Sequence, residues 1–519
     1  MSAIIWLVSL LTPFVLCLLY VLFNDKKLVR IPPEATAISP KRWANEDVRY
    51  SYTIQSNGPT SLLEGKLPSK TGRRYIVVGG AGFLGGWIVL HLLQRGEDPR
   101  RIRVLDIRPP IRKDLQEGAA CDVDFVQVDI TNAKAVNAAF RKAWPDSSQS
   151  ASPQVHEITV FHTAATIRFF ERHPSLLHLS ERVNLHGTQN ILEAAKSIGV
   201  RTLIYTSSGS VGVRRTRLWL WPWQKEPKFF TQVINEDDAN LSRRHEQFFS
   251  NYAVSKLSAE RSVRAADQSP SGDGKLRTGC IRPGNGIYGP GGDLVAGSYL
   301  IRKYNLTWIG TIVQSFIYVE NCSLAHLLYE QRLLELEAGS SNPDIGGRAF
   351  CVADSGAPPT YGDMHNALNL LSNGETTFQD LSPTAMLGLA HLVEWYYLTR
   401  HFLLASPLQF LGRIMPPVDG DLVFLQPSMW ALTNVHLYFD DSSARAPAEK
   451  GGLGYTGCTT LEGVCQVVID HYRTGGEGTK RVIAGHAEAG HSSLVGAEQA
   501  IGVVVDKLVD GIDATKALN

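Results

Sequence analysis

Tyr252 and Lys256, four residues apart in NYAVSKLSAE, are the pair in this sequence best suited to move a proton. In a helix, side chains at this spacing lie on one face. A phenol ordinarily titrates at about pH 10, and an ammonium beside it favours the phenolate. We therefore expect the pKa of Tyr252 to be lowered and Tyr252 to act as a general base. Such a pair is common by chance, so its meaning depends on what surrounds it.

A hydroxyl group is expected beside this pair. The segment LIYTSSGSVG is typical of a strand that ends in Ser207 and Ser208. Ligands of parallel α/β sheets bind at the carboxyl ends of the strands. We expect Ser208 to hydrogen-bond a substrate oxygen beside Tyr252, and Ser207, the alternative, to be a strand-end residue.

A glycine-rich turn lies between an apolar strand and a helix in RRYIVVGGAGFLGGWIVLHLL. Gly79, Gly82 and Gly85 have the spacing of a variant dinucleotide fingerprint. In that motif glycine permits the tight turn, the approach of backbone to a pyrophosphate, and close packing of helix on strand. The turn, including Phe83 and Leu84, therefore predicts a bound dinucleotide.

Acidic residues follow the next two expected strands. Asp106 ends RIRVLD, about 20 residues after the last glycine, where a carboxylate bonds ribose hydroxyls and favours NAD over NADP. Arg108 is close enough to accommodate a 2′-phosphate, so NADP stays open as a cofactor. In VQVDIT, Asp129 and Ile130 end the third strand, where we expect contacts with adenine.

Strands and helices alternate around these motifs. Strands are expected at 74–79, 102–107, 124–129, 158–164, 202–207 and 278–283, and helices at 83–95, 132–143, 176–198 and 251–267. This alternation predicts an α/β fold with a Rossmann-type, doubly wound parallel sheet. We expect the NAD-binding unit over 73–290, a smaller mixed substrate-binding lobe over 291–474, and a C-terminal tail of unassigned role over 475–519.

The first 23 residues carry no charge. A run of about 20 apolar residues can span a bilayer, so a transmembrane anchor is expected over 1–24. A cleaved signal peptide fits less well, because no basic residue precedes the run and no cleavage pattern follows it. Lys26, Lys27 and Arg30 come next, which places the rest in the cytosol. We expect a single-pass protein of the endoplasmic reticulum membrane, with a linker over 25–72.

Two further segments are candidates for lipid contact. RRTRLWLWPWQKEPKFF, residues 214–230, combines aromatic and basic residues, which is typical of a membrane interface. It could instead roof a bulky substrate pocket. The long apolar segment near 384–412 contains charged residues and favours a helix lying on the bilayer or on the core.

Composition argues against other classes of protein. The 51 Lys and Arg residues balance 50 Asp and Glu residues, and the net charge of +1 gives no reason to expect nucleic acid. The seven cysteines are scattered without a Cys-x-x-Cys pair, which argues against a disulfide framework or a zinc site. No metal is expected.

The motifs resemble those of the extended short-chain dehydrogenases/reductases and, within them, the 3β-hydroxysteroid dehydrogenase family. The resemblance runs from about Tyr75 to Tyr472 and rests on VVGGAGFLG, LDI, VFHTAAT, VNLHGTQNILEAA, YTSSGSV, YAVSK, IRPGNGIYGPGG, FIYVENCSLAHLL and GGLGYTG. FIYVENCSLAH is the most specific of these, because nucleotide-sugar relatives usually carry an aspartate in the related stretch. Within the family the chain is most similar to the decarboxylating sterol-4α-carboxylate 3-dehydrogenases.

This resemblance implies a role for each motif residue. Tyr252 would be the base, Lys256 would hold the nicotinamide ribose, and Ser208 would orient the alcohol. Further cofactor contacts are implied for Ala164, Ala165 and Pro283. Asn184 and His162 are expected to be structural.

The implied activity is NAD(P)-dependent oxidation of the 3β-hydroxyl of a sterol or triterpenoid. The most specific form is a 4α-carboxysterol with coupled C-4 decarboxylation, in sterol biosynthesis. Partners would be this lipid, the membrane and other sterol-demethylation enzymes. The alternatives are a tailoring dehydrogenase of secondary metabolism, a Δ5–Δ4 isomerase that needs another acid/base, a nucleotide-sugar epimerase or dehydratase, and a non-catalytic cofactor-sensing scaffold.

Overall fold

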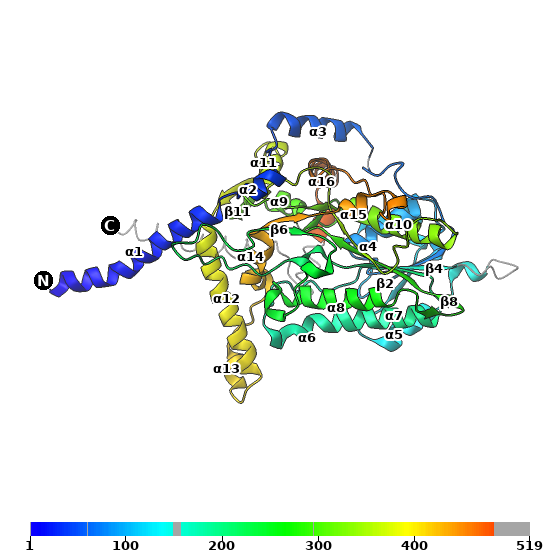
Figure 1. Ribbon diagram of the computed structural model, residues 1–519, viewed down its shortest axis with the longest axis horizontal. Helices are drawn as coiled ribbons and strands as arrows, with labels where there is room; N and C mark the ends of the chain where they lie inside the picture. The colour runs from blue at the N-terminus through cyan, green and yellow to red at the C-terminus, as the bar shows by residue number, and fades with distance from the viewer. Residues whose placement is uncertain (1, 60, 149–156, 294, 482–519) are drawn as a thin grey trace.

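The protein is described from a computed structural model over residues 2–59, 61–148, 157–293 and 295–481 (Figure 1). Its centre is a seven-stranded sheet with the order β13-β9-β5-β4-β1-β2-β3, in which all neighbours are parallel. The strands are β1 Arg74–Val78, β2 Ile102–Asp106, β3 Asp124–Gln127, β4 Ile158–His162, β5 Thr202–Thr206, β9 Arg277–Pro283 and β13 Ala349–Val352. The predicted doubly wound sheet and its six expected strands are confirmed.

Helices cover both faces of this sheet. Alternate residues of a strand point to opposite faces, so in β1 Tyr75 and Val77 pack with one apolar cluster and Ile76 and Val78 with another. The first cluster holds α4 Phe83–Gln94 and α10 Val319–Glu337, and the second holds α5 Ala133–Arg141, α7 Thr188–Ser197 and α8 Asn251–Ala265. Burial on both faces explains why the strands are continuous apolar runs.

β13 was not expected from the sequence. It pairs with β9, with Ala349 opposite Cys280, and so completes one edge of the main sheet. The chain beyond residue 290 therefore returns to the sheet through α10 and β13, and a boundary at 290 does not separate the sheet from the lobe.

The lobe is a mixture of helices and short strand pairs, as expected. Its elements are α9 Ala296–Arg302, β11 Tyr304–Thr307 paired with β14 Thr377–Asp380, α11 Tyr361–Leu371, α12 Pro383–Leu404, α13 Gln409–Ile414, α14 Pro427–Thr433, β15 His436–Phe439 paired with β6 Thr231–Ile234, α15 Ser442–Arg445 and α16 Thr460–Thr474. Smaller elements are α6 Leu177–Glu181 and the pairs β10 Ile287–Tyr288 with β12 Ile317–Tyr318 and β7 Pro270–Ser271 with β8 Gly274–Lys275. The helix predicted near 384–412 is α12 and α13, which project together from the body (Figure 1).

The segment 25–72, expected to be a linker, contains two helices, α2 Pro33–Ile38 and α3 Asn45–Asn57. α3 packs on α16 through few side chains, and Val48 is one of only two buried residues in it. A helix that buries so little shows almost no apolar periodicity, which is why the sequence did not indicate it.

The N-terminal segment forms α1, Ser2–Leu28, which runs past the predicted limit of residue 24. Its end is fastened to the body: the Asn24 side-chain amide donates to the Leu218 carbonyl (3.1 Å) and to Thr384 Oγ1 (2.9 Å). Within the described ranges, none of the helices combines the length and the apolar character needed to cross a bilayer. The predicted transmembrane anchor is therefore not confirmed. The helix expected near residue 500 lies outside the described residues.

Candidate active site

The candidate site lies at the carboxyl edge of the sheet, where β1, β4 and β5 are consecutive neighbours. The glycine turn follows β1, Ala164 and Ala165 follow β4, and Ser207 and Ser208 follow β5. Adjacent strands lie about 4.8 Å apart, so these three segments are brought together as predicted.

Tyr252 stands in the first turn of α8, which Ser250 caps by accepting a hydrogen bond from the Ala253 amide. Its hydroxyl interacts with Ser208, whose own hydroxyl is also hydrogen-bonded to Ser210 Oγ (2.7 Å), and the joint role of Tyr252 and Ser208 in catalysis stays a prediction. Burial raises the pKa of Tyr252, and the bond to Ser208 opposes that rise. The expected lowering by Lys256 is wrong for the free protein.

The environment of Lys256 explains this difference. Lys256 is buried, and its ammonium donates to the Thr206 carbonyl (2.6 Å) and lies 4.2 Å from the centroid of the Tyr205 ring. Burial lowers its pKa to about 7, against a smaller opposing effect of Cys280 and Glu260. A lysine that is itself poorly solvated as a cation supplies little charge to a neighbouring phenol.

The glycine turn has the shape that a dinucleotide requires. Gly79 has φ +84°, and a Cβ there would lie 2.7 Å from the Ala164 nitrogen. A Cβ at Gly85 would lie 2.1 Å from the Gly79 carbonyl oxygen. Both positions exclude any side chain. The two glycines thereby bring the start of α4 close to the ends of β1 and β4, and the amides of Phe83 and Leu84 at this helix start are unpaired. These residues fit a pyrophosphate.

Asp106 is fixed at the end of β2 beside this turn. Its carboxylate accepts from the amides of Ala81 (3.1 Å) and Ile107 (2.7 Å), and burial raises its pKa. The carboxylate therefore faces the turn, where a ribose is expected. Asp129 is exposed and accepts from the Thr131 amide (2.9 Å), while Ile130 is buried against Gly187. Neither arrangement tests their predicted adenine contact.

Pro283 ends β9 next to the serine turn. Its carbonyl oxygen would lie 2.7 Å from a Cβ at Gly209, the residue after Ser208. Pro283, Ser208 and Tyr252 are thus parts of one small region, and Pro283 stays a predicted wall of the nicotinamide pocket.

A buried ion pair beneath the site was missed from the sequence. Arg282 on β9 donates to both carboxylate oxygens of Glu260 on α8 (2.9 and 2.6 Å), and the Ser207 hydroxyl donates to Glu260 (2.5 Å). Glu260 lies one turn beyond Lys256, so the helical spacing that paired Tyr252 with Lys256 would have included it.

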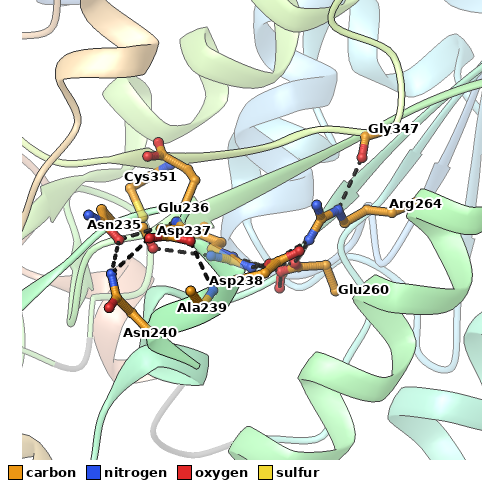
Figure 2. Close-up of polar contacts among 12 residues, drawn as sticks. Asn235, Glu236, Asp237, Asp238, Ala239, Asn240, Glu260, Arg264, Gly347 and Cys351 are labelled. Atoms are coloured by element: carbon orange, nitrogen blue, oxygen red, sulfur yellow. Dashed lines mark hydrogen bonds and ion pairs between the residues drawn. The ribbon is translucent and has the colours of Figure 1, made fainter. Parts of the chain in front are cut away.

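The segment that follows the insertion is tied to this ion pair (Figure 2). Asp238 bonds to Arg264 of α8 (2.9 Å), and Arg264 also donates to the Gly347 carbonyl (3.1 Å). Glu236 accepts from the Cys351 amide of β13 (2.7 Å). These contacts therefore hold α8, β9 and β13 together near Glu260.

His162 and Asn184 have structural roles, as expected. His162 is buried, bonds to Thr188 Oγ1 (2.9 Å), and has its pKa lowered to about 3, mainly by burial. Asn184 bridges the Thr166 backbone and the Ser255 hydroxyl (2.9 Å) and thereby ties the loop after β4 to α8.

The aromatic insertion 214–230 lies at the end of α1. Trp219 stacks on Tyr20 of α1 (ring centroids 6.1 Å apart) and is partly buried. Trp221 and Trp223 stack on one another (5.4 Å) and are 54% and 75% exposed.

Comparisons with known proteins agree with this geometry. Residues 76–374 match the model of the 3-beta hydroxysteroid dehydrogenase/isomerase family. The chain is 26% identical to a 3beta-hydroxysteroid-dehydrogenase/decarboxylase of Arabidopsis thaliana over 80% of its own length and 64% of that relative. It is 30% identical to a decarboxylating sterol-4-alpha-carboxylate 3-dehydrogenase of Candida albicans over 55% of its own length and 71% of that relative. Among solved structures, an epimerase of Methanothermobacter thermautotrophicus matches with a TM-score of 0.51 and 17% identity, covering 79% of this chain and 95% of that one, which shows the fold alone.

Proposed function

Because the chain belongs to the 3-beta hydroxysteroid dehydrogenase/isomerase family, we propose that it oxidises the 3β-hydroxyl of a 4α-carboxysterol and that carbon dioxide is then lost. The chain is an NAD-dependent oxidoreductase that acts on a CH–OH group. The sterol-4α-carboxylate substrate is supported by the names of the relatives. The interaction between Tyr252 and Ser208, at the sheet edge that also carries the glycine turn, supports the proposed chemistry.

In this proposal three side chains handle the alcohol. Ser208 hydrogen-bonds the 3β-oxygen, and Tyr252 Oη accepts the hydroxyl proton. Lys256, whose ammonium is held by the Thr206 carbonyl, binds the nicotinamide ribose. The chemistry that bound NAD supplies is acceptance of the hydride from C3.

Decarboxylation follows from the position of the new ketone. After oxidation the substrate is a β-keto acid, so the bond between C4 and the carboxylate carbon can break with its electron pair passing into an enolate. Tyr252, protonated by the first step, lies beside the ketone oxygen and returns the proton to the enolate. The residues that oxidise the alcohol thus also stabilise the negative oxygen.

The proposal is tested by incubating the purified protein with NAD and 3β-hydroxysterols that either carry or lack a 4α-carboxyl group. NADH formation with both, and carbon dioxide release with the carboxylated sterol alone, is expected. Oxidation of the plain sterol with no turnover of the acid would favour a tailoring dehydrogenase. Turnover of nucleotide sugars in place of sterols would overturn the assignment.

We also propose that the protein works at the endoplasmic reticulum membrane. Its exposed large apolar side chains are concentrated on α1, on the insertion and on α12 and α13. α1, α12 and α13 project from one end of the molecule (Figure 1). We call this the apolar surface and define it by Phe14, Leu19, Trp221, Trp223, Trp395 and Ile414, which are 54–75% exposed. Exposed apolar area of this kind supports contact with lipid.

A further inference from the structure

A large cavity lies outside the residues assigned to catalysis. It has a volume of about 950 Å³, and its walls come from the insertion, from the segment 239–247 and from α12. Ser208, Tyr252 and Lys256 do not line it. A cavity of this size suits a small organic ligand better than a single ion.

The walls of this cavity are strongly basic. Six cations that line it have no carboxylate partner in the described part of the chain: Arg214, Arg215, Arg217, Lys228, Arg243 and Arg244. A seventh, Arg172, is paired with Glu394 (2.5 Å). Glu246 is the one acidic residue among the described lining residues.

The hydrogen bonds of two of these cations do not offset their charge. Arg214 donates to the Asn240 carbonyl (3.1 Å) and Arg217 to the Gln224 side-chain oxygen (2.6 Å), and both acceptors are neutral. Burial, and then the charge of Arg172, lowers the pKa of Arg215, and the Glu394 carboxylate partly opposes this. An anion in the cavity would relieve this repulsion and would gain charge-assisted hydrogen bonds.

The cavity borders the apolar surface. Leu218 and Trp219 line it, and the same two residues hold the end of α1 through Asn24 and Tyr20. Leu387 and His391 of α12 complete this wall, and the exposed pair Trp221 and Trp223 follows directly in the chain. Aromatic side chains next to cations are the arrangement found where a protein meets lipid headgroups.

We propose that this cavity binds the phosphate of an anionic phospholipid whose acyl chains lie on the apolar surface. The inference deepens the membrane part of the proposed function and is independent of the dehydrogenase chemistry. Free phosphate esters share the same recognition chemistry, but they would make no use of the adjoining tryptophans.

The test measures binding of dihexanoyl phosphatidic acid, a short-chain lipid that stays in solution, to the full-length protein in non-ionic detergent. Arg215→Gln/Arg244→Gln should weaken this binding about 30-fold, since each cation near an anionic headgroup contributes roughly a fivefold change in affinity. The matched control Lys134→Gln/Arg141→Gln removes two exposed cations from α5, which lies at the end of the molecule away from α1 and α12 (Figure 1), and should leave binding unchanged.

Each other outcome overturns part of the inference. An equal loss in both double variants would mean diffuse electrostatic attraction without a site. Equal binding of dihexanoyl phosphatidylcholine would remove the role of anionic charge, and equal binding of glycerol 3-phosphate would assign the cavity to a soluble ester. Melting temperature and NADH formation, which should match the wild-type values, show that each variant is folded.

Discussion

Tyr252 and Lys256 both lie in surroundings that oppose their charged forms. Burial raises the pKa of Tyr252 and lowers that of Lys256 to about 7, so neither charge is favoured in the free protein. The bond of Tyr252 to Ser208 and the bond of Lys256 to Thr206 fix where the two groups point. The positions of the two side chains are therefore fixed in the free protein, although neither side chain favours its charged form there.

Replacing Tyr252 by phenylalanine should remove the base and leave the fold intact. We expect turnover to fall by at least about 100-fold, while NAD affinity, measured by titration of the purified protein, stays at the wild-type value. Tyr304→Phe is the control, because Tyr304 is 60% exposed and far along the chain from the site. Turnover near wild type in Tyr252→Phe would remove Tyr252 as the base.

The stability of the protein should depend on pH through Lys256. The native state loses this proton at about pH 7, whereas the ordinary pKa is 10.5, so between these values the unfolded chain binds more protons. The free energy of unfolding of the wild type should then rise from pH 7 to 10 relative to Lys256→Met. Urea unfolding measures the difference, and exposed Lys450→Met should show no such trend. A flat difference for both would contradict the lowered pKa.

At the scale of elements, α8 and β9 are joined by a charge pair that water does not reach. Glu260 and Arg282 both have side chains that are 0% exposed, and Ser207 adds a hydrogen bond from the end of β5. Removing one partner of a buried pair leaves the other charge uncompensated. The pair therefore fixes the serine turn relative to the helix that carries Tyr252.

Glu260→Gln should destabilise the protein by about 3–5 kcal/mol and should lower kcat more than it changes KM, because the alcohol would be held less accurately. Urea unfolding and steady-state kinetics measure these effects. Glu375→Gln, which breaks the exposed pair with Lys303 (3.0 Å), should cost below about 1 kcal/mol. The idea fails if both variants lose the same stability.

At the scale of the whole molecule, the sheet and the apolar surface lie at opposite ends (Figure 1). α1 and the insertion are locked together, since Asn24 and Lys27 of α1 donate to backbone carbonyls of residues 218, 222 and 224. Two of the parts proposed to meet lipid are thus joined to one another by hydrogen bonds.

Trp221→Ser/Trp223→Ser should weaken partitioning of the full-length protein into neutral phosphatidylcholine vesicles by at least roughly tenfold, since two exposed indoles lose apolar contact. Co-sedimentation with vesicles measures this. Tyr50→Ser/Tyr472→Ser removes two exposed aromatic rings from α3 and α16 and should leave partitioning unchanged. Unchanged partitioning in the tryptophan variant would remove the insertion from the interface.

Local patterns in the sequence were enough for the parts of the protein that depend on them. The apolar strands, the glycine turn and the Tyr252–Lys256 spacing are short-range features, and all were predicted. β13 was missed because it comes after the regular alternation of strands and helices has ended, and α3 because it buries little. The pairing of Glu260 with Arg282 depends on how α8 crosses β9, which no spacing within either segment records.

The position of β13 at the edge of the sheet has a consequence for synthesis. Parallel strands cannot be joined by a tight turn. Each strand pair therefore forms only after the long connection between its two strands has been synthesised. Until the ribosome has completed α10 and β13, the outer edge of β9 presents unpaired amides and carbonyls to solvent. A nascent chain stalled in that interval is a ready template for mispairing, and chaperones that mask open edges should associate with it during this interval.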